Sequence, residues 1–93
     1  MKVLIVESAQ HVREELGLQL RARGHEVIEC MNGRDALRRV DSYDADPLIA
    51  AEQLPDMTGA QIVEQLRRNS SHASLPVLVL KEARMQHVSL TVH

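Results

Sequence analysis

Short apolar runs alternate along the chain with stretches of helical periodicity. The runs are MKVLIV (1–6), EVIEC (26–30), PLIAA (47–51) and PVLVL (76–80). Runs of this length that are apolar and rich in β-branched residues are typical of short strands, and the most apolar ones suit strands buried on both faces. We therefore predict four strands at these positions.

Apolar residues between the runs recur with the spacing of a helix. Val12, Leu16 and Leu20 lie on one helical face, and Gly24 follows where a helix commonly ends. Ser8 is expected to be the N-cap of this helix. Stripes of the same kind predict two further helices, at Ala36, Leu37 and Val40 and at Ile62, Val63 and Leu66.

The order of these elements determines the fold class. Thr58 followed by Gln61 fits a capping box and marks the start of the third helix. Strand then alternates with helix from the first run to the fourth, which is the pattern of βαβ units around a parallel sheet. We predict an α/β fold with a doubly wound, mostly parallel sheet.

The end of the chain has a different pattern. Val88, Leu90 and Val92 alternate with polar residues, as in a strand with one polar face. A parallel crossover needs roughly a dozen residues or more, and the connection from the fourth strand is shorter. The segment is therefore expected to fold back antiparallel or to be exchanged with another subunit, and a frayed or helical tail is the alternative. We divide the chain into a core (1–83) and a C-terminal strand or tail (84–93).

Composition narrows the class of protein. The net charge of −2 and pI near 6.2, without long runs of one sign, argue against a nucleic-acid-binding domain. The single cysteine, Cys30, excludes an internal disulfide and suits a reducing cytoplasm. The apolar start is too short for a membrane span. We expect a cytoplasmic protein that binds neither nucleic acid nor membrane.

The segments MKVLIVES, GHEVIECMNGRDAL, LPDMTGAQIVEQLR and LPVLVL carry a family resemblance. Over residues 2–82 the chain resembles the first four β-α repeats of a bacterial response-regulator receiver domain, and the LPDMTG turn is the most specific match. The resemblance implies a five-stranded flavodoxin-like fold that accepts a phosphoryl group on an aspartate from a histidine kinase. It also implies magnesium, held by an acidic pair after the first strand.

The resemblance assigns the functional positions of the family to this sequence. The acidic pair falls on Glu7 and Ser8, the phosphoacceptor on Ala51, and the hydroxyl residue that ends the fourth strand on Lys81. The lysine and the last helices that receivers carry further on have no counterpart, so we expect a receiver truncated at its C-terminal side.

These replacements predict a degenerate phosphoacceptor pocket formed by Glu7, Ser8, Ala51, Glu52 and Lys81. The methyl group of Ala51 offers no nucleophile, and Glu52, the next residue on the strand, points to the opposite face. Asp56 is interpreted as a turn residue. Because magnesium prefers several hard oxygen ligands, we expect no catalytic residue, metal or cofactor.

Two other side chains carry open interpretations. Lys81 is expected to form an ion pair with Glu7 across the ends of adjacent strands, or else to extend into water. Cys30 is expected to be a small buried residue. The five histidines lack metal-ligand spacing.

We therefore predict a phosphorylation-independent pseudo-receiver, not an enzyme, that acts as a protein–protein interaction or dimerisation module in bacterial two-component signalling. Its expected partner is a second copy or another signalling protein, and the expected dimer segment comprises His87, Val88, Leu90 and Val92. Three alternatives stay open. In the first, the chain is a receiver phosphorylated at Glu52. In the second, it is an adaptor that binds a cyclic dinucleotide through Arg34 and Arg38. In the third, it is a piece of a longer regulator.

Overall fold

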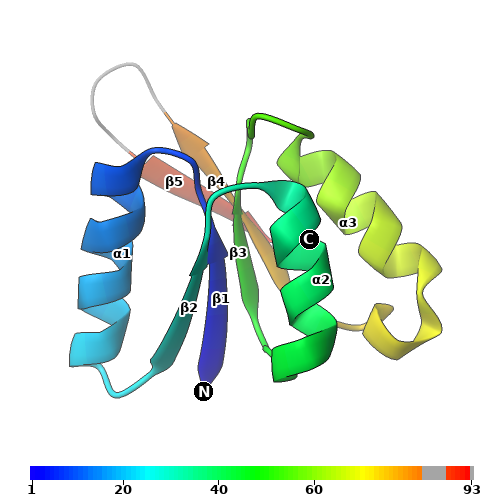
Figure 1. The fold of residues 1–93 in the computed structure, drawn as a ribbon, viewed down its shortest axis with the longest axis horizontal. Helices are drawn as coiled ribbons and strands as arrows, with labels where there is room; N and C mark the ends of the chain where they lie inside the picture. Colours follow the sequence, from blue (N-terminus) through cyan, green and yellow to red (C-terminus); the bar gives the residue numbers. More distant parts are fainter. Residues whose placement is uncertain (83–87, 93) are drawn as a thin grey trace.

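The protein folds into a five-stranded sheet with helices on both faces (Figure 1). The computed structural model describes residues 1–82 and 88–92. The strands are β1 (Lys2–Val6), β2 (Glu26–Cys30), β3 (Leu48–Ala51), β4 (Val77–Glu82) and β5 (Val88–Val92). The helices are α1 (Gln10–Ala22), α2 (Gly33–Tyr43), α3 (Gly59–Arg68) and a short 3₁₀ helix (Ser70–His72).

The sheet has the strand order β2-β1-β3-β4-β5, and its first four strands are parallel. In the register of the central strands, Val6 lies opposite Cys30 on one side and Ala50 on the other. The C-terminal ends of β1, β2 and β3 therefore lie side by side, along the side of the sheet formed by the strand ends. The predicted doubly wound α/β fold is confirmed.

β5 pairs antiparallel with β4, so that Leu80 lies opposite Leu90 and Leu78 opposite Val92. Of the two paths predicted for a C-terminal strand, the structure shows the one in which the segment folds back antiparallel within the same chain. Such a return is compatible with a connection too short for a parallel crossover. Residues 83–87 and 93 lie outside the described residues, and His87 of the expected dimer segment is among them.

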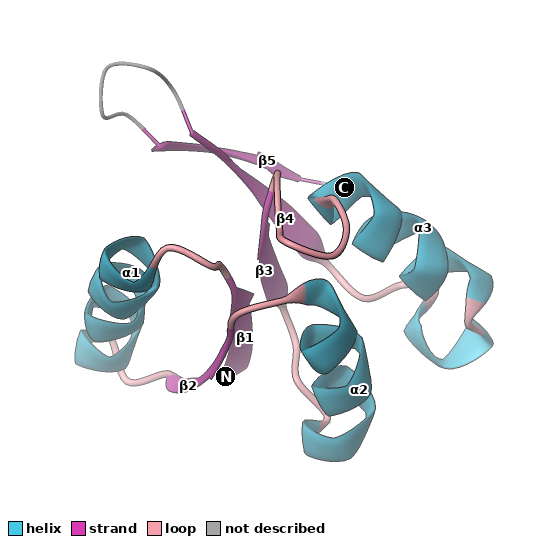
Figure 2. Ribbon diagram, turned by 45° about the horizontal axis from the view of Figure 1, so that its top comes forward, coloured by secondary structure: helices cyan, strands magenta, loops and turns pink. Residues whose placement is uncertain are grey.

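Two hydrophobic clusters lie on opposite faces of the sheet. The larger cluster packs between the sheet and α2 and α3, with Leu4, Val40, Ile62 and Val77 fully buried. The smaller one packs between the sheet and α1. Figure 2 shows α1 alone on its side of the sheet, opposite α2 and α3.

The ends of the helices follow local sequence signals, with one exception. Thr58 and Gln61 form both hydrogen bonds of the predicted capping box, and Gly24 ends the first helical segment with a φ of 88°. The expectation for Ser8 was wrong, because Ala9 is the N-cap residue and no side chain caps this helix. The carboxylate of Glu7 instead accepts the backbone N–H of Ala9. Within the described part of the chain, no helix is long and apolar enough to cross a membrane.

Candidate functional site

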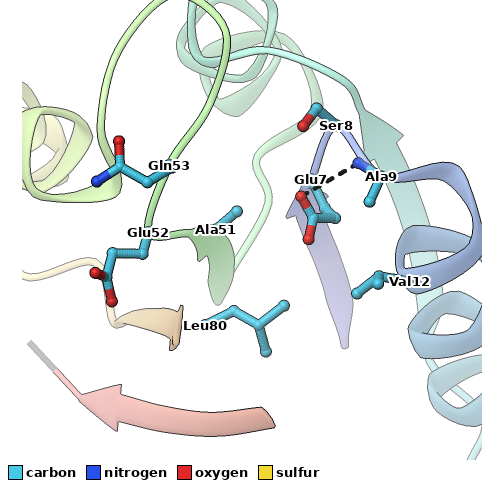
Figure 3. A pocket seen from close by; sticks show the side chains of 8 residues that line it. All are labelled: Glu7, Ser8, Ala9, Val12, Ala51, Glu52, Gln53 and Leu80. Atoms are coloured by element: carbon cyan, nitrogen blue, oxygen red, sulfur yellow. Dashed lines mark hydrogen bonds between the residues drawn. The ribbon is translucent and has the colours of Figure 1, made fainter. Parts of the chain in front are cut away.

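A cavity of about 280 Å³ opens at the C-terminal edge of the sheet, between the loops that follow β1 and β3. Figure 3 shows the residues that line it, which are Glu7, Ser8, Ala9, Val12, Ala51, Glu52, Gln53 and Leu80. The cavity lies where ligands bind in open α/β sheets, outside the carboxyl ends of the strands. Four of the five residues expected to form the pocket are therefore brought together, and Lys81 is not among them.

Glu7 is the charged residue at the bottom of this cavity. It follows the last residue of β1, and the residue is 8% exposed. Its Oε2 atom accepts the N–H of Ala9 at 3.3 Å, as drawn in Figure 3. The guanidinium of Arg13 donates to the backbone oxygen of Glu7 at 2.8 Å and pairs with Glu29. No cation of residues 1–82 or 88–92 pairs with the Glu7 carboxylate itself.

Ala51, the last residue of β3, presents a methyl group to the cavity and is 5% exposed. The backbone around it is firmly held. The N–H of Glu52 donates to Leu80 O at 3.0 Å, and the N–H of Gly59 donates to Glu52 O at 3.0 Å. The strand end and the following loop thus keep a hydrogen-bonded frame around a side chain that has no reactive atom.

Glu52 lies at the rim of the cavity and is exposed. Its carboxylate points away from Glu7 and from the methyl group of Ala51 (Figure 3). Successive residues at the end of a strand face opposite sides of a sheet, which accounts for this direction. Glu52 therefore does not bring its carboxylate to the position that Ala51 leaves without one.

The expectation that Lys81 lies beside Glu7 on an adjacent strand was wrong. β3 lies between β1 and β4 in the sheet. Leu80 lines the cavity, so Lys81, the next residue of β4, lies on the opposite face. Lys81 is exposed, and within the described ranges it forms no ion pair with Glu7. Its exposure fits the alternative interpretation, a side chain that extends into water.

The donor set of the cavity does not fit the magnesium ion that its position in the fold would suggest. Magnesium needs oxygen ligands in near-octahedral geometry, commonly from more than one carboxylate. Glu7 offers one buried carboxylate and Ser8 a neutral hydroxyl, whereas Ala51 offers no oxygen from its side chain. Among the residues that the structure describes, no group of three His, Cys, Asp or Glu side chains could hold a metal.

Asp56 has a role that the sequence alone did not reveal. Its two carboxylate oxygens accept the backbone N–H groups of Gly33 and Arg34, each at 2.8 Å. These bonds hold the pKa of Asp56 below its usual range and tie the turn after β3 to the start of α2. Asn32 adds a local cap through a bond from the N–H of Asp35. The interaction of Asp56 joins residues more than twenty positions apart, so no local sequence signal predicts it.

The two arginines of the cyclic-dinucleotide alternative do not converge on one site. Arg34 lines a hollow with Ser8, Met31 and Asp56 at the β2–α2 loop. Arg38 lines a different hollow beside Tyr43. Arg38 is also engaged, because its guanidinium pairs with Asp35 and lowers the pKa of that carboxyl group. The two guanidinium groups are therefore not placed to bind one phosphate together.

Cys30 ends β2 and is fully buried, as the sequence predicted. Burial, with a smaller contribution from the neighbouring Asp35, raises the pKa of its thiol to about 11. The thiolate is the reactive form of cysteine, so this thiol is inert near neutral pH.

Comparison with known proteins connects the fold and the cavity to a family. The family model described as response regulator receiver domain matches residues 3–91. The two-component response regulator PhoP of Pseudomonas aeruginosa is 35% identical over 80 residues, which cover 86% of this chain. The virulence transcriptional regulatory protein PhoP of Salmonella typhimurium is 38% identical over the same share. The chain spans 35% of the length of each of these relatives.

Solved structures agree with these sequence matches. The chemotaxis response regulator CheY4 of Vibrio cholerae superposes with a TM-score of 0.83 at 30% identity, over 89% of this chain and 69% of that protein. The receiver domain of a signal transduction histidine kinase from Syntrophus aciditrophicus superposes with a TM-score of 0.81 at 28% identity, over 85% and 60%. Sequence, fold and the cavity at the strand ends agree, and the chain belongs to the response regulator receiver domain family of two-component signalling.

Proposed function

We propose that this receiver domain does not accept a phosphoryl group and acts in signalling by binding another protein or a second copy of itself. The observation that carries the proposal is Ala51. A methyl group stands at the end of β3, inside the cavity and next to Glu7. A methyl group cannot attack a phosphoryl donor, and Glu52 points away from this position.

The intact frame around the cavity supports a retained structural role. The capping box of α3 is complete, and Asp56 holds the start of α2. Local sequence signals and tertiary contacts agree with the receiver fold, while the position that reacts in the family carries alanine. A domain that keeps the fold but lacks its nucleophile is suited to recognition.

The β5 edge of the sheet supports self-association. β5 (Val88–Val92) forms one edge and contains neither a charged residue nor a proline, the devices that commonly protect an exposed edge. The opposite edge, β2, carries Glu26 and Glu29, and Glu29 pairs with Arg13 and Arg21 of α1. Two β5 strands paired antiparallel around a twofold axis would form a closed, symmetric dimer.

Intact-mass spectrometry after incubation with a small-molecule phosphodonor and Mg²⁺ tests the phosphorylation proposal. We expect no addition to the wild-type chain, while a receiver that carries the aspartate gains one phosphoryl group under the same conditions. Glu52→Gln is the matched variant. A phosphoryl group found on the wild type and lost in Glu52→Gln would overturn the proposal and identify the displaced acceptor.

Light scattering over a range of concentrations tests self-association. We expect a mass that rises to that of a dimer for the wild type and stays at that of a monomer for Val92→Lys, because Val92 is 72% exposed on the edge strand. Leu18→Lys places the same charge on an exposed residue of α1 and serves as the control. A monomeric wild type at every concentration would contradict dimerisation and leave another protein as the partner.

A further inference from the structure

Among residues 1–81 and 92, for which burial is described, Glu7 is the only charged residue that is buried. Its Oε2 atom accepts a single long bond of 3.3 Å from Ala9, and Oε1 has no partner in the described part of the protein. A buried carboxylate is costly unless it is paired with a cation or well hydrogen-bonded. No cation among the side chains that the structure describes compensates this one, and it opens into a cavity (Figure 3).

The walls of the cavity define what could supply the missing charge. Val12, Ala51 and Leu80 form an apolar side, and the exposed carboxylate of Glu52 lies at the rim. The nearby guanidinium of Arg13 is engaged elsewhere, because it bonds to the backbone oxygen of Glu7 and pairs with Glu29. The cavity is thus acidic at one end and apolar along one side.

We propose that this cavity binds an organic cation, an alkylammonium or guanidinium group carried on an aliphatic stem. The cation pairs with the Glu7 carboxylate, and the stem lies against Val12, Ala51 and Leu80, as the stems of lysine and arginine commonly lie along apolar surface. This assignment rests on the proposed protein-binding function, in which the cation is a basic side chain of the partner. A free alkylamine has the same chemistry and is the second source.

The chemistry of the cavity separates this ligand from a metal ion or an anion. A metal ion would find only one buried carboxylate, that of Glu7, and the neutral hydroxyl of Ser8 at the closed end of the cavity, fewer hard oxygen ligands than magnesium commonly takes. An anion would meet like charge at Glu7 and Glu52. An extended cation can use both the carboxylate and the apolar side.

An NMR titration of the full chain with n-butylammonium tests the proposal, with methyl signals of Val12, Ala51 and Leu80 as the readout. n-Butanol is the neutral control of similar size, and MgCl₂ is the inorganic control. We expect saturable shifts with n-butylammonium that are much weaker with either control. Nα-acetyl-lysine methylamide represents a side chain on a polypeptide. Binding of this probe at least as tight as that of n-butylammonium would favour a partner protein as the source of the cation, and much weaker binding would favour a free alkylamine.

Glu7→Gln keeps the shape of the side chain and removes its charge. A hydrogen bond to a charged group is stronger than one to a neutral amide, so we expect n-butylammonium to bind at least about tenfold more weakly to this variant. Glu15→Gln makes the same change on an exposed position of α1 and should leave binding unchanged.

Equal shifts with n-butanol or with MgCl₂ would overturn the proposal, and so would unchanged binding in Glu7→Gln. Absence of binding by both amine probes would do the same. The comparison of the three small probes uses the wild type alone, so it stays decisive even where the variant is unstable. Phosphorylation of the wild type is measured separately, so failure of the cation site and failure of the proposed function are distinguishable.

Discussion

The two faces of the sheet are covered unequally. On the face of α2 and α3, strand and helix residues such as Leu4 and Ile62 are both fully buried. On the other face the strand residues are buried, but Val12, Leu16 and Leu20 of α1, which pack against them, are only half-buried. A single helix therefore covers a face that two helices cover on the opposite side (Figures 1 and 2).

The difference separates the part that stabilises the fold from the part that carries the site. Val12 and Leu80, which line the cavity, belong to the α1 face. The larger cluster packs on the opposite face. Substitutions around the cavity should therefore cost less stability than substitutions on the α2 and α3 face, and this freedom is consistent with the replaced residues at the strand ends.

The largest effect is expected from Ile62→Ala. Ile62 lies in α3 with no exposed surface, and truncation of such a residue leaves a cavity that costs about 2–5 kcal/mol of unfolding free energy. Urea unfolding followed by circular dichroism measures the loss. Val63→Ala, at a half-buried position of the same helix, should cost less, and equal losses would show that the larger cluster is loosely packed.

Gly59→Ala should have the next largest effect. A Cβ atom at Gly59 would lie 2.5 Å from the backbone oxygen of Ala51, so α3 must shift away from β3, at a cost of about 1–3 kcal/mol. Gly17→Ala is the matched control, because its Cβ atom would meet only the ends of the Arg21 and Glu29 side chains at 3.1 Å. A lower unfolding temperature for Gly17→Ala than for Gly59→Ala would contradict this prediction.

The substitution Leu16→Ala measures how much the packing of α1 against the sheet contributes to stability. Leu16 is half-buried, and partial loss of its apolar contact should reduce the unfolding free energy by about 1 kcal/mol. The same urea unfolding experiment provides the number. A loss of unfolding free energy as large as that of Ile62→Ala would show that the α1 face contributes as much to stability as the α2 and α3 face.

The smallest effect is expected from Asp56→Asn and concerns acid stability. The bonds from Gly33 and Arg34 lower the pKa of Asp56 in the folded state. A lowered pKa stabilises the fold above the ordinary Asp range, near pH 4, and this contribution is lost as the pH falls through the folded value. The wild type should therefore lose more stability on acidification than the variant. Superimposable unfolding profiles between pH 2 and pH 7 would contradict this.

Most of the fold could be predicted because its signals are local. The apolar runs marked four of the five strands, the Val88 to Val92 alternation marked the fifth, and Thr58 with Gln61 marked the start of α3. The prediction for Ser8 was wrong although the residue is suited to capping, because the N-cap is Ala9, one residue later, and the Glu7 carboxylate accepts the N–H of Ala9.

The candidate site was harder to predict, because it depends on which strands are neighbours. The positions after β1 and β3 could be placed at one edge from the βαβ pattern, and the structure brings Glu7 and Ala51 to one cavity. Whether Lys81 reaches Glu7 could not be predicted in this way, since the answer depends on the strand order and on the side of the sheet that Lys81 faces. The bonds of Asp56 to the start of α2 were missed for the same reason.

The methyl group of Ala51 also relieves a strain that an acidic residue would create. A second carboxylate at this position would face Glu7 across a cavity that holds no cation from the described part of the chain, and two like charges at close range raise the free energy of the folded state. Receivers that keep the aspartate must tolerate this repulsion for the sake of reactivity, a trade of stability for activity. Under the proposed function, in which no phosphoryl group is accepted, this domain is free of that cost.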